Sequence, residues 1–540
     1  MYRVDQSMGI SYVRVKMAAL RFPGDRRHRV GRGVLFFILI SLIVAACATA
    51  PEQDPTAPPP STGIRQYDVA LELIAAESID DRLSIYSAIA ASLARDGRVQ
   101  SAADLLNYSR GLLQNEELSV DQRIRAQARL LAAWQIVASR DETRSELVNG
   151  LTRELVNETD AREDASLQAD VFRMIFGAQL DNGNAGEAAL RRTLDIAYLI
   201  DSDSVRSETL VYAAEQVEGR DDRIALNPLA QQAIAAVPAL EDSLLAADLN
   251  ARLAVLSDVL DRRQDVSTLS DRVLRRSQAG LIVDETQSPR LRRIVRSLVG
   301  VNRDQDVPQI LANVAPQFMR ALAFGWYAAA LWEAGSSGEA GMSAEAAFEE
   351  AYQLAQDIGD AGARAETRAV LIRLRSEYDA DYNVEDVAAT LLAEARLSSI
   401  PSERREVVLS ELAVAYTISD RRELVDRLRG LIASRDELAR INIRTARALE
   451  ELGRDEEAVD YLRTVTTMPP PGINDTTAPG LRAARVWQSL EEYDRAISAV
   501  LYSTAVDVAS ILSTIPASHE INPATRGQLG RRVEEAQPDG

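Results

Sequence analysis

The chain has 540 residues, of which 46% are hydrophobic, and its 61 Lys and Arg against 81 Asp and Glu give a formal net charge of −20. This acidic balance argues against binding to a nucleic-acid backbone, which depends on neutralising phosphates with Lys and Arg. Lys16 is the only lysine, so a P-loop or a Schiff base in the body of the chain is excluded.

The first predicted element is a short apolar segment behind a group of arginines. Four arginines between residues 26 and 32 precede the unbroken apolar or small run 34–46, and this run ends in Val-Ala-Ala directly before Cys47, the only cysteine. A membrane-spanning helix needs roughly 20 residues to cross the ~30 Å hydrocarbon core. The shorter run therefore predicts a signal peptide over residues 1–46. The alternative is a true membrane anchor that ends near an ordinary thiol.

The spacing of the apolar run and Cys47 resembles the lipobox of bacterial lipoproteins. This resemblance implies cleavage before Cys47, acylation of the new N-terminus with chains such as palmitate, and a location outside the cytoplasm. Ala48 and Thr49, with no Asp behind the cysteine, are compatible with sorting to an outer membrane, so we expect a lipid-anchored protein of the cell envelope that faces the periplasm. After residue 46 the charge is −26, which argues against electrostatic attachment to anionic lipid.

Residues 47–63 are predicted to form a tether behind the acylated cysteine. Five prolines fall between residues 51 and 60, and the segment has no large apolar side chain. Such a sequence cannot bury a core and favours an extended, partly polyproline II conformation. At up to ~3.1 Å per residue, the tether would hold a folded part several nanometres from the bilayer.

Residues 64–468 are predicted to be almost entirely helical. The segment is rich in Ala, Leu, Arg and Glu and contains only six prolines, and a proline inside a helix costs about 3 kcal/mol. Tyr86, Ile89, Ala90 and Leu93 recur at the spacing that places side chains on one face of a helix. The sequence therefore predicts an all-α fold.

Four glycine–alanine pairs share one spacing, with the alanine five residues after the glycine. A glycine at the end of a helix permits a tight turn, and a small alanine lets the next helix approach closely. The pairs are Gly97 with Ala102, Gly183 with Ala188, Gly335 with Ala340, and Gly453 with Ala458. After the third pair, a second possible start of the same helix follows Met342, at Ala344.

These spacings resemble tetratricopeptide repeats. In the best match, Ala446, Gly453, Ala458, Leu462 and Pro470 fall on the family's small, turn, small, apolar and terminal-proline positions. The intervals are irregular elsewhere, so generic stacked helix pairs are the alternative. Both predict an open-ended α-solenoid of antiparallel helix pairs with an extended concave surface, because each pair buries its apolar face only against its neighbours.

The C-terminal part is predicted to contain a proline-rich loop and a last helix pair over residues 469–515. Residues 516–540 are polar, which predicts a short frayed helix or a disordered tail. His519 is the only histidine after residue 46, so neither a zinc site built on histidines nor a serine-type triad is available. We expect no metal, no cofactor and no catalytic residues.

Two local features are candidate partner-binding surfaces. Residues 262–303 hold ten arginines against four acidic residues, and Arg can bind carboxylates bidentately; alternatively, these arginines pair with acidic neighbours. Residues 324–332 hold four aromatic side chains, which either pack in the core or offer a peptide-binding hot spot. The candidate residues are Arg275, Arg276, Arg292, Arg293, Arg296, Trp326 and Trp332.

The expected function is that of a scaffold or adaptor, not an enzyme, which binds other envelope proteins through a helical-repeat surface. The resemblance to tetratricopeptide lipoproteins implies roles in outer-membrane protein assembly, secretion, pilus biogenesis or regulation of wall synthesis. One alternative is a protein that acts on cell-wall glycan, similar to lytic transglycosylases, because glycosidic cleavage can run on carboxylates alone. Another alternative is an envelope protein that binds a small ligand.

Overall fold

The structure, a computed structural model, describes residues 58–536 except 114–117, 163, 182–196, 220–222, 336–340, 380–381, 396–399, 433, 467–476 and 502. The predicted signal peptide, Cys47 and most of the tether lie outside the described residues. Residues from 57 onward form one compact unit. Among the helices described, none is long and apolar enough to cross a membrane.

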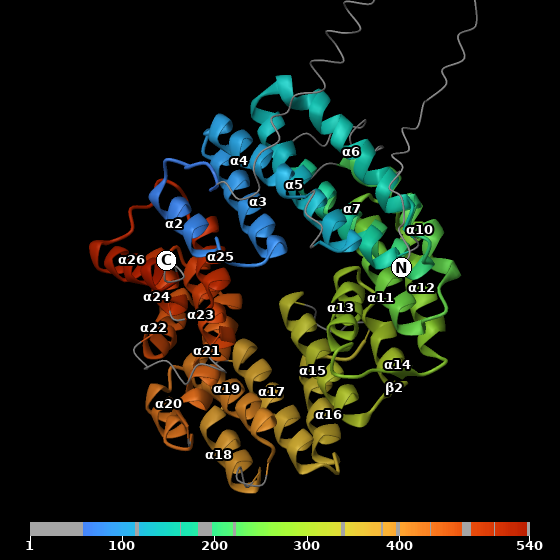
Figure 1. The fold of residues 1–540 in the computed structure, drawn as a ribbon. Coiled ribbons are helices and arrows are strands. Elements are labelled where there is room, and N and C mark those ends of the chain that lie inside the picture. The colour runs from blue at the N-terminus through green and yellow to red at the C-terminus, as the bar shows by residue number, and fades with distance from the viewer. Residues whose placement is uncertain are drawn as a thin grey trace, which may run out of the picture. The chain divides into compact units, whose positions relative to one another are not determined.

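The described chain is all-α and is built from two rows of helices (Figure 1). The odd-numbered helices from α3 to α25 form the inner row, in which each packs against the next. The inner helices are α3 (Ile79–Arg95), α5 (Val120–Arg140), α7 (Ala165–Asp181), α9 (Asp203–Glu218), α11 (Ser243–Val259), α13 (Ser288–Gly300), α15 (Gln317–Glu333), α17 (Ala361–Tyr378), α19 (Ser402–Ile418), α21 (Arg435–Glu451), α23 (Thr477–Ser489) and α25 (Ala505–Thr514).

The even-numbered helices form the outer row and cover the outward faces of the inner helices (Figure 1). They are α2 (Arg65–Leu73), α4 (Val99–Leu112), α6 (Ser145–Asp160), α10 (Arg223–Ala236), α12 (Arg263–Ser277), α14 (Val307–Leu311), α16 (Ala344–Gln356), α18 (Val384–Ala395), α20 (Arg422–Arg429), α22 (Asp455–Thr466), α24 (Tyr493–Val500) and α26 (Pro523–Ala536). Three short 3-10 helices are η1 (Glu142–Arg144), η2 (Val237–Ala239) and η3 (Asp304–Asp306), and the strands β1 (Leu281–Ile282) and β2 (Val314–Ala315) pair in parallel.

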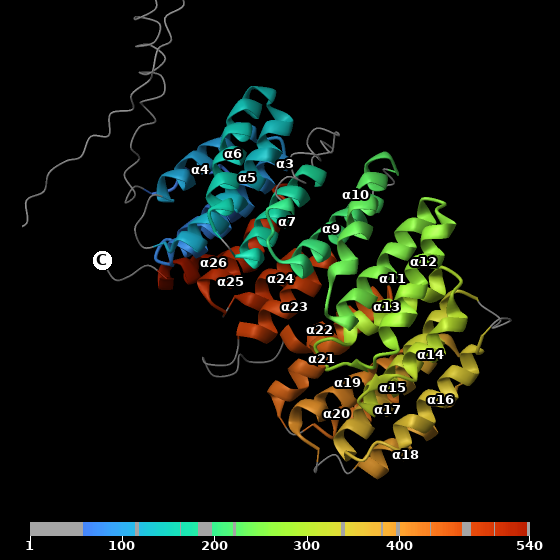
Figure 2. The ribbon, with the colours of Figure 1, turned by 90° about the vertical axis from the view of Figure 1, so that its right-hand side faces the viewer.

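The two ends of the helix array meet, so the inner row forms a closed circuit. The last inner helix, α25, packs against both α2 and α3, and the C-terminal helices lie beside the N-terminal ones in both Figure 1 and Figure 2. The Tyr67 hydroxyl donates to the Ile515 carbonyl at 2.8 Å, and the Ser92 hydroxyl donates to the Ser513 carbonyl at 2.9 Å. The prediction of an open-ended solenoid was therefore wrong about the ends, which cover each other.

A left-handed backbone residue ends the first helix at several of the inter-helix turns. The predicted glycine turns are confirmed at Gly97, Gly335 and Gly453, where φ lies between 59° and 79°; Gly183 lies outside the described residues. The same conformation occurs without glycine at Asp261, Asn302, Asp420 and Glu491. Asn and Asp reach this region at moderate cost because their short side chains bond locally, so a search for glycine alone missed these turns.

An arginine follows five of these left-handed residues, and its backbone N–H closes the turn. In each case this N–H donates to the carbonyl five residues earlier, which satisfies a carbonyl at the helix end that has no partner inside the helix. The sequence signal of the repeat is thus a Gly, Asp or Asn followed by Arg. The five arginines are Arg98, Arg262, Arg303, Arg421 and Arg454.

The C-terminal segment is more ordered than the sequence predicts. Residues 516–540 were expected to form a frayed helix or a disordered tail, but α26 packs against α2 and α24. Its Leu529 and Val533 are buried in the same apolar cluster as Tyr67 and Leu512. They lie one helical turn apart in an otherwise polar segment, so the buried stripe is too short to stand out in the sequence.

Gly325 lies where α15 packs tightly against α17. A Cβ atom at this position would clash with the Leu371 side chain of α17. We expect Gly325→Ala to lower the free energy of unfolding by about 1–3 kcal/mol, because extra volume in a packed core forces neighbours off their rotamers. Urea unfolding followed by circular dichroism measures this change. Gly300→Ala is the control, since nothing lies within 4 Å of its Cβ position, and equal effects for both variants would contradict the expectation.

Candidate functional site

The inner helices present charged side chains on the face that the outer helices do not cover. Many of these side chains form ion pairs between neighbouring inner helices. Arg129 Nη1 of α5 lies 3.1 Å from Asp80 Oδ1 of α3, and Arg405 Nε of α19 lies 2.8 Å from Glu437 Oε1 of α21. The inner row is therefore joined by polar contacts around the circuit as well as by its apolar core.

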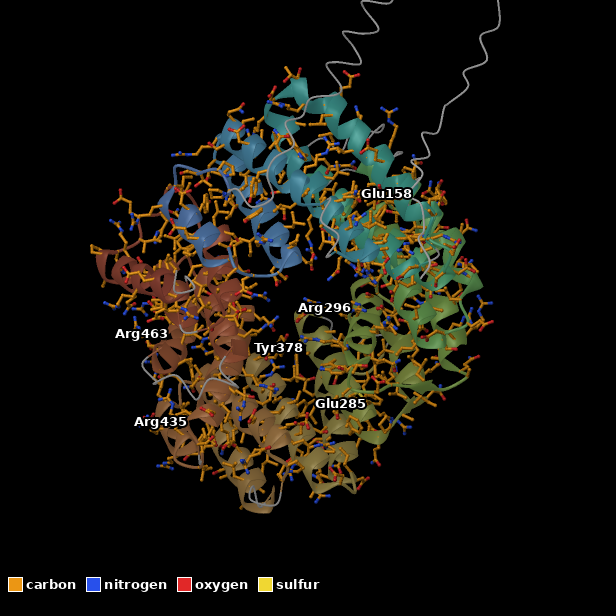
Figure 3. The ribbon with its side chains drawn as sticks, viewed as in Figure 1. Glu158, Glu285, Arg296, Tyr378, Arg435 and Arg463 are labelled. Carbon is orange, nitrogen blue, oxygen red and sulfur yellow. The ribbon has the colours of Figure 1, made fainter. Side chains whose placement is uncertain are left out.

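One connected set of polar contacts joins α13, α15 and α17. Arg296 Nη2 of α13 lies 3.0 Å from Glu333 Oε2 of α15. The Tyr378 hydroxyl of α17 donates to Glu333 Oε1 at 2.8 Å. Figure 3 shows Arg296 and Tyr378 near the middle of the circuit of helices. Glu333 thus connects three inner helices, and Arg296 remains largely exposed beside it.

A second set of contacts continues from α17 to α19 and is more buried. Arg373 contacts both Glu377, on its own helix, and Glu411 of α19. Burial raises the pKa of the Glu377 carboxyl above its ordinary value of 4.5, while the Arg373 guanidinium lowers it and the Glu411 carboxylate raises it. Two carboxylates therefore share one guanidinium in a largely desolvated position.

Glu366 lies on α17, about two helical turns before Arg373, and its spacing places it on the same face of the helix as Arg373 and Glu377. Burial raises the pKa of the Glu366 carboxyl, and Arg404 of α19, 3.9 Å away, lowers it. We call the whole group the inner-face cluster. Its members are Arg292, Arg296, Glu333, Glu366, Arg373, Glu377, Tyr378, Arg404 and Glu411.

The inner-face cluster was missed by the sequence analysis because its partners come from different helices. Arg373 and Glu411 are 38 residues apart, and Tyr378 and Glu333 are 45 residues apart. The one local signal was the spacing of Glu366, Arg373 and Glu377, which places three charges on one stripe of a helix that also needs an apolar stripe.

Most of the arginines between residues 262 and 303 have structural partners, as the alternative interpretation held. Arg293 binds Asp248 of α11 through two hydrogen bonds, of 3.0 and 2.7 Å, and this carboxylate is 1% exposed. Arg290 pairs with Glu208 at 2.6 Å. By contrast, Arg292 is exposed and has no ion pair or side-chain hydrogen bond with another described residue. Arg293 thus binds a buried carboxylate of the fold, whereas its neighbour in sequence, Arg292, does not.

We expect Arg293→Ala to destabilise the fold and Arg292→Ala to leave it unchanged. Removing one member of a buried ion pair costs about 3–5 kcal/mol, and the cost here falls at the lower end because Arg252 lies 3.7 Å from the same Asp248. An exposed side chain without partners contributes within about ±0.5 kcal/mol. Urea unfolding of both variants measures the difference. A loss of similar size in Arg292→Ala would contradict this division.

The other predicted site residues do not come together on one surface. Arg275 and Arg276 lie on the outer helix α12, and their side chains bond the carbonyls of Asp271 and Pro238. Trp326 and Trp332 lie on α15 and pack against the core. Trp332 stacks on Tyr378 with ring centroids 5.4 Å apart. The Arg375 guanidinium lies over the Trp332 ring, 5.1 Å from its centroid.

Within the described part of the chain, no group of His, Cys, Asp and Glu is arranged to hold a metal ion. Exposed large apolar side chains there are scattered, as with Val120 at the start of α5 and Ile282 in the strand β1. The inner-face cluster therefore offers charge and hydrogen bonding rather than an apolar groove.

No family model matches the sequence. No curated protein matches it either. Among solved structures, the chain is similar to a protein described as a circular tandem repeat protein with novel repeat topology and enhanced subunit contact surfaces, at 14% identity and a TM-score of 0.18, over 82% of this chain and 98% of the other. At that TM-score the similarity carries no argument about fold, and closure of the array rests on the contacts of this chain alone. The class that these contacts define is an all-α helical-repeat protein.

Proposed function

We propose that this protein is a lipid-anchored scaffold of the cell envelope, which binds a charged segment of another envelope protein on the inner face of its helix array. The anchoring part of the proposal is supported by the lipobox-like residues before Cys47. The repeat part is supported by the tetratricopeptide-like spacing around Gly453 and Ala458. Ala458 is fully buried, as that resemblance requires.

The observation that carries the binding proposal is the inner-face cluster. Arg292 on α13 and Arg444 on α21 are exposed, and neither forms an ion pair with another described residue. Arg292 acts electrostatically on the Glu377 carboxyl, and Arg444 acts on the Glu366 carboxyl, so Arg444 adds a second exposed guanidinium beside the inner-face cluster. A partner segment with acidic and hydrogen-bonding side chains would pair with these guanidiniums bidentately, and the partly exposed Glu333 would accept from its donors.

In-cell crosslinking followed by affinity capture of the full-length protein tests this function. Reproducible capture of envelope proteins, lost in Cys47→Ser and in the double variant Arg292→Glu with Arg444→Glu, supports an anchored scaffold that binds at its inner face. A control double variant on outer and exposed positions, Arg422→Glu with Arg463→Glu, should capture the same partners as the unmodified protein. Capture of the protein alone, or an unchanged partner set in the inner-face variant, would overturn the proposal.

A second candidate function is cleavage or binding of wall glycan, and the raised pKa of the Glu366 carboxyl favours it. A raised pKa favours the protonated form of a carboxyl, which can donate to a leaving-group oxygen. Purified peptidoglycan incubated with the full-length protein in detergent tests this alternative. Turnover that is abolished in Glu366→Gln supports cleavage, and absence of soluble fragments with the unmodified protein excludes it. Absence of co-sedimentation of the protein with peptidoglycan excludes binding.

A further inference from the structure

The position where the helix array closes contains a cavity with an excess of positive charge. The cavity measures about 390 Å³ and lies between the start of α2, the turn before α4, and α26 with the loop that precedes it. This volume is in the range of small-molecule sites, roughly 300–1,000 Å³. Four of its lining residues can carry positive charge, namely Arg65, Arg98, His519 and Arg526, against a single carboxylate, that of Glu520.

Two of the three guanidiniums at this cavity, those of Arg65 and Arg98, are not used by the fold. Arg65 and Arg98 form no ion pair and no side-chain hydrogen bond with another described residue, and the one side-chain bond of Arg526 is to the Ile521 carbonyl at 2.9 Å. His519 has an acidic neighbour, since its Nε2 lies 3.5 Å from Asp494 Oδ2. The guanidiniums of Arg65 and Arg98 have no such neighbour, and like charges gathered without partners repel each other. The fold of a chain with net charge −20 nevertheless gathers them here.

Comparison with the equivalent turns shows that Arg98 has lost its usual partner. Arg98, Arg262, Arg303, Arg421 and Arg454 all follow a left-handed residue. In three of these turns the side chain pairs with a carboxylate three residues on: Arg262 with Asp265 at 2.8 Å, Arg303 with Asp306 at 2.6 Å, and Arg454 with Glu457 at 2.6 Å.

At Arg98 the position three residues on is Ser101, and at Arg421 it is Leu424. Neither arginine therefore has the carboxylate that its equivalents use. Arg98 lines the cavity at the closure, whereas Arg421 does not. The two differ in location but not in local structure, which makes Arg421 a matched control.

We propose that this cavity is a binding site for a phosphate group, held by Arg65, Arg98 and Arg526. Guanidiniums that come from three separate elements can surround an oxyanion, and charge-assisted hydrogen bonds of this kind are about twice as strong as neutral ones. Because Arg65 and Arg98 come from the N-terminal helices and Arg526 from the C-terminal one, the bound phosphate holds the closure together. Ligand binding then stabilises the closed array by mass action. This site is separate from the inner-face cluster and does not depend on the proposed scaffold function.

Isothermal titration calorimetry of the full-length protein in detergent tests the site, with NaCl adjusted to keep ionic strength constant. The first arm uses inorganic phosphate and pyrophosphate, and the second uses glycerophosphoglycerol, a soluble analogue of a phospholipid headgroup. Binding in the first arm alone assigns a free phosphate compound, and binding in the second alone assigns a lipid headgroup. In either case we expect Arg65→Ala with Arg98→Ala to weaken binding about 100-fold, since each charged hydrogen bond contributes roughly tenfold.

The control is Arg421→Ala with Arg422→Ala, which removes the same charge at an equivalent turn outside the cavity. This variant should bind with unchanged affinity. The melting temperature of both double variants without ligand should match that of the unmodified protein. Arg65, Arg98 and Arg421 form no ion pair with a described residue, and the single pair of Arg422, with Asp420 at 3.9 Å, is exposed and contributes little. Absence of binding in both arms, or an equal loss of affinity in the two double variants, would overturn the proposal.

Discussion

Replacing Tyr67 with Ala is expected to open the closed helix array. Tyr67 of α2 is fully buried, α2 packs against α25, and burial raises the pKa of the Tyr67 hydroxyl to about 12. Truncation of a buried aromatic residue to Ala costs about 3–5 kcal/mol. In a linear repeat array the terminal units fray first, because each unit is stabilised only by its neighbours. Here each end is the neighbour of the other, so the lost packing should separate them.

Small-angle X-ray scattering of Tyr67→Ala measures the separation as an increase in the radius of gyration under native conditions. Phe172→Ala is the matched control, since Phe172 is equally buried but lies on α7, away from the closure. It should lose comparable stability without expansion. Tyr67→Phe removes only the donor to the Ile515 carbonyl, which costs about 1–3 kcal/mol, and the array should stay closed. An unchanged radius of gyration in Tyr67→Ala would show that the closure does not depend on this packing.

Replacing Arg373 with Met is expected to destabilise the array strongly near neutral pH and much less in acid. The side chains of Arg373 and Glu377 are 15% and 10% exposed. Removing the guanidinium leaves Glu377 and Glu411 as neighbouring buried carboxylates, and loss of one partner of a buried ion pair costs about 3–5 kcal/mol. Arg373 lowers the pKa of Glu377, so this pKa rises further in the variant.

The sign of the pH dependence follows from proton binding. The pKa of Glu377 is already above its ordinary value of 4.5 in the folded protein, so the native state holds this proton more tightly than the unfolded state. Its contribution to stability is greatest below pH 4.5 and decreases as the pH rises. In Arg373→Met the decrease should be steeper. Urea midpoints of Arg373→Met, measured from below pH 4.5 to neutral pH, should therefore diverge from those of the unmodified protein as the pH increases.

A double-mutant cycle separates the charge effect from the loss of packing. Glu377→Gln in the Arg373→Met background removes one of the two unpaired carboxylates, and we expect it to restore part of the lost stability near neutral pH. Arg447→Met is the control for removal of an inner-row arginine, because the Arg447 side chain is 72% exposed. A pH-independent loss in Arg373→Met would show that packing, and not the carboxylates, determines the effect.

Local structure was largely predictable from the sequence because it depends on neighbouring residues. The scarcity of proline and the apolar spacing around Ile89 predicted helices, and glycine predicted the turns at Gly97 and Gly453. The helix start after Met342 is also confirmed, since α16 begins at Ala344 with Ser343 as its N-cap. The turns at Asp261 and Asp420 were missed because their left-handed residues are not glycine.

The candidate site was only partly predictable. The sequence identified the arginines of α13, but it could not show that Arg293 is bound to the buried Asp248 whereas Arg292 is free for a partner. That division depends on which helix packs beside α13, and ion pairs between helices 30 to 45 residues apart leave no local pattern. Arg275 and Arg276 are close to the arginines of α13 in sequence, but they lie on α12, which is an outer helix.

By itself, the sequence determined that residues from 64 onward form stacked helices with tight turns, since propensity, apolar period and turn chemistry are properties of short segments. Only the tertiary structure decided that the array closes, that a cavity with three arginines forms at the closure, and that carboxylates from α15, α17 and α19 share an inner face. The physical reason is that closure depends on a small rotation between successive helix pairs, added over the whole array. Residues 67 and 515 meet only when that sum is complete.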